Sequence, residues 1–142
     1  MSKKGVDREA FINQSTIVSA KFNSQCTYIG ESAFKDCISL SEINDDNVIE
    51  TIESNAFAGT NISSAYFNVL NILHADAFNG CSNLRRIKII GTGQIQDYSS
   101  SNQPWYSISH QIDSIEIDEE VISIGEYGLA NLVLLKHVSL NK

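Results

Sequence analysis

The chain has 142 residues, 42% of them hydrophobic and 19% charged, a composition typical of one folded domain and unlike that of a disordered chain. Seventeen acidic residues outnumber ten basic ones, and the resulting net charge of −7 disfavours nucleic acid as a partner. No apolar run approaches the roughly 18 residues that a membrane helix needs, so membrane insertion is not expected.

A sequence unit recurs along the chain and reads I-x-x-x-A-F-x-x-C-x-x-L-x-x-I-x-I. The first four aromatic anchors follow one another at intervals of 23, 23 and 21 residues, and the next clear copy comes 51 residues later. That gap suits two units, so we predict a degenerate fifth unit in which Tyr106 fills the buried anchor position after an insertion at about 91–104. Six units then form one predicted domain, 1–142, with the anchors Phe11, Phe34, Phe57, Phe78, Tyr106 and Leu129.

Apolar residues recur six, nine and eleven positions after each anchor, as in Leu84, Ile87 and Ile89. The period-two pair indicates a short strand with one buried face, so one strand per unit is predicted. A second apolar set precedes each anchor by eight and five residues, as in Cys26 and Ile29. A single unit cannot bury these residues alone, so the units must stack and share a continuous core.

The written-out unit resembles the BspA-like leucine-rich repeats. IGESAFKDC at 29–37 and DAFNGCSNL at 76–84 are close matches to the I-G-x-x-A-F-x-x-C-x-x-L signature, and GTGQIQDYSSSNQPWYS at 91–107 is similar to a segment found between such repeats. The resemblance covers Val6 to Leu140. It implies an α/β-type leucine-rich repeat solenoid with a concave sheet of short strands, few or no long helices, and no catalytic function.

By the same resemblance, the expected function is protein binding. Better-known members of the family are surface proteins that bind host matrix or other cells, so the resemblance implies an adhesion module that is exposed at the cell surface or secreted. Two alternatives stay open: a cytoplasmic scaffold with the same fold, which three unpaired cysteines would suit, and a structural spacer within a longer repeat array.

The chain offers little for catalysis or for a cofactor. Cys37 and Cys81 fill the same inward position two units apart, about 10 Å at strand spacing, which is too far for a disulfide. The three histidines fall at different positions of the unit, so they do not converge on a nucleophile. The acidic cluster 44–47 lacks the spaced ligands of a calcium loop, and we expect a turn there. No enzyme, metal site or cofactor is predicted.

The aromatic residues near the insertion allow two readings. Trp105 could pack the inserted segment against the core, or it could form a recognition patch with Tyr98, the residue of this group expected to be most exposed.

Outward positions of the strands carry the predicted site, because packing does not dictate their identity. A basic unit lies beside an acidic one, which allows either cross-strand ion pairing or a charged stripe that selects a protein or glycoprotein partner. The predicted partner-binding residues of the concave face are Tyr66, Arg85, Arg86, Lys88, Asp113, Glu116, Lys136 and His137.

The two ends of the array show no dedicated polar cap in the sequence. An open terminal unit of a solenoid exposes apolar side chains and unpaired strand groups. We therefore expect either a longer array or self-association of the chain through its ends.

Overall fold

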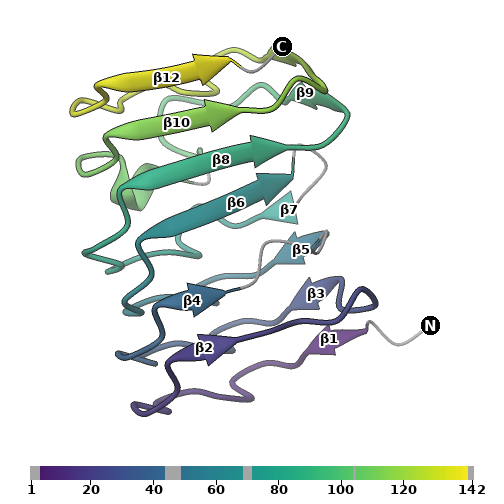
Figure 1. The fold of residues 1–142 in the computed structure, drawn as a ribbon, viewed down its shortest axis with the longest axis vertical. Helices are drawn as coiled ribbons and strands as arrows, with labels where there is room; N and C mark the ends of the chain where they lie inside the picture. Colours follow the sequence, from purple (N-terminus) through teal and green to yellow (C-terminus); the bar gives the residue numbers. More distant parts are fainter. Residues whose placement is uncertain (1–3, 44–48, 69–71, 104, 141–142) are drawn as a thin grey trace.

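The computed structural model describes residues 4–43, 49–68, 72–103 and 105–140. The chain winds as a coil, and each complete turn of the coil, here called a rung, stacks on the one before it (Figure 1). The acidic cluster 44–47, predicted to be a turn, lies outside the described residues. No α-helix occurs in the described ranges; a single 3-10 turn, η1, covers Tyr106–Ile108.

One side of the coil carries the predicted strands, all parallel. A four-stranded sheet has the order β12-β10-β8-β6, and β2 pairs separately with β4. In this sheet Ala65, Ile87, Ile115 and Val138 lie in register, so the position nine residues after each anchor falls in one column. The strands are β2 (Ser19–Ala20), β4 (Glu42–Ile43), β6 (Ser64–Asn68), β8 (Arg86–Ile90), β10 (Ser114–Ile117) and β12 (His137–Leu140).

The opposite side of the coil carries a second set of strands (Figure 1). The pattern predicts one strand per unit, and the structure has two. The additional strands contain the apolar residue five positions before the anchor, because stacking places every recurrent extended segment next to its copy at strand spacing. They form the sheet β1-β3-β5-β7 and the pair β9-β11. These strands are β1 (Gly5–Val6), β3 (Tyr28–Ile29), β5 (Thr51–Ile52), β7 (Ile72–Leu73), β9 (Gly93–Ile95) and β11 (Val121–Ile124).

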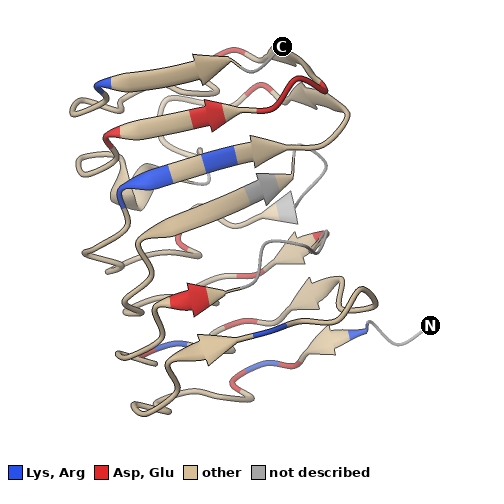
Figure 2. Cartoon of the chain, viewed as in Figure 1, with Lys and Arg blue, Asp and Glu red and all other residues tan. Residues whose placement is uncertain are grey.

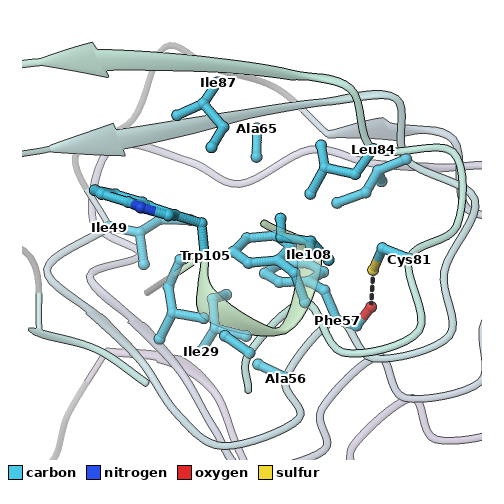
Figure 3. Packing of buried hydrophobic residues seen from close by; sticks show 14 of the residues in the cluster. Ile29, Ile49, Ala56, Phe57, Ala65, Cys81, Leu84, Ile87, Trp105 and Ile108 are labelled. Carbon is cyan, nitrogen blue, oxygen red and sulfur yellow. Dashed lines mark hydrogen bonds between the residues drawn. The ribbon is translucent and has the colours of Figure 1, made fainter. Parts of the chain in front are cut away.

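An aromatic column runs through the core of the first four rungs. The ring centroids of successive phenylalanines are 5.1, 5.4 and 5.6 Å apart, and the ring planes deviate by only 2–9°. Phe57 and Phe78 are completely enclosed, whereas Phe11, at the end of the column, is 41% exposed. The column thus ties each rung to its neighbours through Phe11, Phe34, Phe57 and Phe78 (Figure 3).

The predicted anchor of the fifth rung is wrong. Tyr106 is 46% exposed, while Trp105 and Ile108 are buried in the core cluster. The 3-10 turn at this point changes which side chains face inward, and the larger apolar surface of the indole is the one removed from water. Figure 3 shows Trp105 inside the coil with Ile108. Of the two readings for Trp105, the structure therefore has packing.

Hydrogen bonds from the inward cysteines support the turn that contains each anchor. The thiol of Cys81 donates to the carbonyl of Phe57 one rung earlier at 3.0 Å, and the Cys37 thiol donates to the carbonyl of Phe11 at 3.1 Å (Figure 3). Thr60, which replaces cysteine in its rung, donates to the Phe57 carbonyl at 2.9 Å. All three cysteines are buried and free, and burial raises the pKa of each thiol.

Candidate functional site

The outer face of the β6–β12 sheet presents two parallel rows of side chains. Alternation along each strand sends every second residue outward, and strand pairing aligns those residues across rungs. Between the rows, Ala65, Ile87 and Ile115 point inward and are buried. One row contains Ser64, Arg86, Ser114 and His137, and the other contains Tyr66, Lys88, Glu116 and Ser139.

These two rows, together with Lys136, line an open hollow of about 610 Å³, here called the sheet-face hollow. Its floor is the backbone of four consecutive parallel strands, so its shape depends on a rigid element. A hollow of this volume falls in the range of ligand-binding clefts.

Positive charge predominates in the sheet-face hollow although the whole chain is acidic. Glu116 is the one acidic residue among those that line it, against Arg86, Lys88, Lys136 and the titratable ring of His137. Lys88 and Glu116 form a cross-strand ion pair at 3.2 Å (Figure 2), and this contact raises the pKa of Lys88 through its hydrogen bond and its charge. Within the described part of the chain, Arg86 and Lys136 have no ion-pair partner.

Six of the eight residues predicted for partner binding line the hollow, and two do not. Arg85 and Asp113 precede their strands, at the turn. There the Arg85 guanidinium donates to the carbonyl of Ser82 at 2.9 Å, and the Asp113 carboxylate accepts from the Ser114 hydroxyl at 2.9 Å. The predicted residues in the hollow are Tyr66, Arg86, Lys88, Glu116, Lys136 and His137.

Three serines of the lining carried no chemical signal in the sequence. Ser64, Ser114 and Ser139 are small and uncharged, and only their strand positions, eight or ten residues after an anchor, point to the outer face. Their small size leaves room between the charged residues.

The inserted segment does not provide an exposed aromatic patch. Tyr98, expected to be exposed, is half-buried, and its ring meets that of Trp105 edge-on at a centroid distance of 6.1 Å. Burial raises the pKa of Tyr98, and Gln96 donates to its hydroxyl at 3.2 Å. The Tyr98 ring is held in the packing of the insertion, so it is not available as a recognition element.

A serine, an aspartate and a histidine converge on the turns of the third and fourth rungs. Asp76 lies 2.7 Å from Nδ1 of His74 and accepts a 2.9 Å hydrogen bond from the hydroxyl of Ser54. The carboxylate is central here, so the serine proton is directed to the aspartate and the histidine cannot act as its base. A nucleophilic serine needs the histidine between the two other groups.

The described residues hold no group of three or more histidine, cysteine or carboxylate side chains arranged for a metal ion. Within the same residues, no helix is long and apolar enough to cross a membrane.

The sequence model described as "BspA type Leucine rich repeat region" matches residues 4–110 in six copies. The chain belongs to this family. The parallel pairing of β10 with β12 carries the repeat architecture beyond the matched residues to Leu140. Membership confirms the resemblance seen in the sequence and the prediction of a leucine-rich repeat solenoid with short strands.

Two solved structures resemble this BspA-type repeat chain. A leucine rich cell surface protein from Faecalibacterium prausnitzii superposes with a TM-score of 0.53 at 16% identity, covering 95% of this chain and 44% of its own length. A leucine-rich repeat protein from Bacteroides ovatus gives a TM-score of 0.37 at 15% identity, with coverage of 95% and 64%. The chain thus spans less than two thirds of either protein, and the first likeness concerns the fold alone. No curated protein matches the sequence.

Proposed function

We propose that the chain is a non-enzymatic interaction module whose sheet-face hollow binds an acidic, extended segment of a protein or glycoprotein. The observation that carries the proposal is the excess of basic side chains in a hollow on an otherwise acidic molecule. Such a local reversal of charge attracts an acidic partner and rejects basic ones.

The size of the hollow supports a short peptide-like ligand. Its rows cross four strands spaced about 4.8 Å apart, a span of roughly 14 Å that about four extended residues would cover. Arg86 and Lys136 would contact the acidic groups, the serines would offer hydrogen bonds, and Tyr66 would provide an amphipathic contact surface.

An array of short acidic and basic peptides, with their neutral counterparts, tests this binding. We expect the wild-type chain to retain acidic peptides, with retention that falls as salt concentration rises. The variant R86E/K136E should lose them by about tenfold or more, since a tenfold change in affinity needs only about 1.4 kcal/mol. It leaves the Lys88–Glu116 pair in place.

The matched control is R8E/K35E, which makes the same change in charge on turns away from the hollow. It should keep its acidic peptides. If both variants lose them equally, the net charge of the molecule and not the hollow is responsible, and the proposed site is refuted.

We further propose that the module acts at the cell surface or after secretion. The support is the description of the Faecalibacterium prausnitzii structure as a leucine rich cell surface protein. Antibody labelling of intact and permeabilised source cells distinguishes this from a cytoplasmic scaffold. Signal on intact cells is expected, and signal that appears only after permeabilisation would favour the scaffold.

A further inference from the structure

The outer faces of the first and last described rungs match one another in four independent respects. We name them the N-face, formed by residues 4–26, and the C-face, formed by residues 118–140. They lie at opposite ends of the coil (Figure 1).

Both faces expose side chains of types that are buried inside the stack. On the C-face, Val138 and Leu140 are 54% and 62% exposed, whereas Ile115 and Ile117, their register partners one rung earlier, are buried. On the N-face, one side of the Phe11 ring stacks on the next rung and the ring remains partly exposed. Each face therefore carries apolar surface that another rung would cover.

The backbone of the anchor turns has a fixed direction. Amides at and two residues either side of the anchor donate to carbonyls of the following rung, at 2.9, 2.8 and 2.8 Å for the first pair of rungs and 3.0, 2.8 and 2.8 Å for the second. The donors are Glu9, Phe11 and Asn13 in the first rung and Ser32, Phe34 and Asp36 in the second.

This direction leaves acceptors on one face and donors on the other. Among the described residues, no donor reaches the carbonyls of Arg8, Ala10 and Ile12 on the N-face. In the same residues, the corresponding amides of the last turn reach no acceptor; they belong to Tyr127, Leu129 and Asn131.

The two end turns also share one backbone conformation. The residues two before and two after the anchor are left-handed in both, with φ of 56° and 62° at Glu9 and Asn13 and of 55° and 67° at Tyr127 and Asn131. The second rung, on which the first one stacks, has the same pair of left-handed residues. A ladder between the C-face and an N-face would thus repeat a geometry already present inside the molecule.

The charges of the two faces are opposite. A hollow of about 360 Å³ on the N-face contains Lys4 and Lys21 beside Val6 and Phe22. On the C-face, a hollow of about 720 Å³ follows β10 and contains the acidic run 118–120 beside Leu140 (Figure 2). Both hollows involve the loop between a long-sheet strand and the short strand that follows it.

We infer that the C-face binds the N-face of a second copy of this chain, so that copies associate head to tail and continue both sets of strands. Association of like faces would set donors against donors and equal charges against each other. A head-to-tail contact uses two different surfaces, and both stay available at the ends of the complex, so assembly is open and grows with concentration.

The test compares two variants with the wild-type chain by sedimentation velocity over a concentration series. The N-face variant is K4E/K21E, and the C-face variant is I122K/L140K, all at exposed positions. We expect the wild-type chain to form a series of oligomers and each variant alone to associate at least about tenfold more weakly. An equimolar mixture should recover one-to-one dimers, because each variant retains the face that the other lacks.

A charge-exchange variant provides the matched control. K4E/K21E/E119K/E120K reverses the charge of both faces and should associate with itself again. A wild-type chain that stays monomeric at high concentration would overturn the inference. So would dimers of K4E/K21E alone as strong as those of the wild-type chain, since they would show contact between like faces.

Discussion

At the scale of single residues, the fold depends on positions that repeat in each rung. The anchor aromatic contributes twice, by removing apolar surface from water and by stacking on the ring of the next rung. A terminal ring has only one such neighbour, so its contribution should be smaller.

Replacement of the central aromatic measures this difference. Phe57→Ala should lower the free energy of unfolding by about 3–5 kcal/mol, because the enclosed ring leaves a cavity between two rungs. Phe11→Ala, which removes a partly exposed ring with one stacked neighbour, should cost about half as much or less. Urea denaturation of both variants gives the comparison. Equal losses would contradict the enclosed column.

Two glycines allow a second matched test. Gly59 and Gly80 have the same left-handed φ of +72°, which makes an alanine side chain unfavourable by about 1 kcal/mol at either position. At Gly59 an added Cβ would also approach the Asp36 carboxylate to 2.6 Å, whereas at Gly80 the nearest atom is 3.6 Å away. Thermal and urea denaturation should therefore show Gly59→Ala as the more destabilised variant. Asp36→Ala in the same chain should reduce that excess, and an undiminished excess would exclude the contact as its cause.

At the scale of elements, the strand that follows each anchor could be predicted, but the second strand could not. The residues at nine and eleven after the anchor alternate, as in Ile87 and Ile89, and alternation is visible in a sequence. A two-residue strand such as β5 has no period to detect. It exists because stacking brings its copies together.

The fifth rung shows another limit of the pattern. Tyr106 keeps the spacing of an anchor, yet spacing cannot foresee that η1 turns Trp105 and Ile108 inward instead. In the candidate site, strand alternation correctly places Arg86 and Lys88 on the outer face. It misplaces Arg85 and Asp113 in the hollow, because they precede their strands and engage the turn.

A contact between turns of successive rungs should make stability depend on pH. Partial burial raises the pKa of Asp76, but the hydrogen bond from Ser54 and the protonated ring of His74 outweigh it and hold the pKa below its usual value. A carboxylate with a lowered pKa stabilises the fold above its unfolded pKa of about 3.9, and the contribution is lost as pH falls through the folded value.

Asp76→Asn removes this contribution. At pH 5 the variant should be less stable than the wild-type chain by about 0.5 kcal/mol, a small value because both partners are substantially exposed and screened. At pH 2.5 the two free energies of unfolding should converge. Asp7→Asn, on an exposed residue of the first turn, is the control. A difference between Asp76→Asn and the wild-type chain that persists unchanged at pH 2.5 would assign the loss to packing.

At the scale of the whole molecule, the distribution of charge separates the surfaces by function. The sheet-face hollow is basic, the C-face is acidic, and the N-face is basic again. The sheet-face hollow lies on the side of the coil, so a partner bound there leaves both end faces open, and the two proposals can be tested independently.

The most direct test of the sheet-face hollow is to map amide chemical shifts by NMR while an acidic peptide is added to the C-face variant I122K/L140K, in which end-to-end association is weakened. The proposal predicts shifts concentrated on β6, β8, β10 and β12, strongest at Arg86 and Lys136, and absent in R86E/K136E. Shifts concentrated on the inserted segment or on the short-strand side of the coil, with the sheet face unchanged, would contradict it.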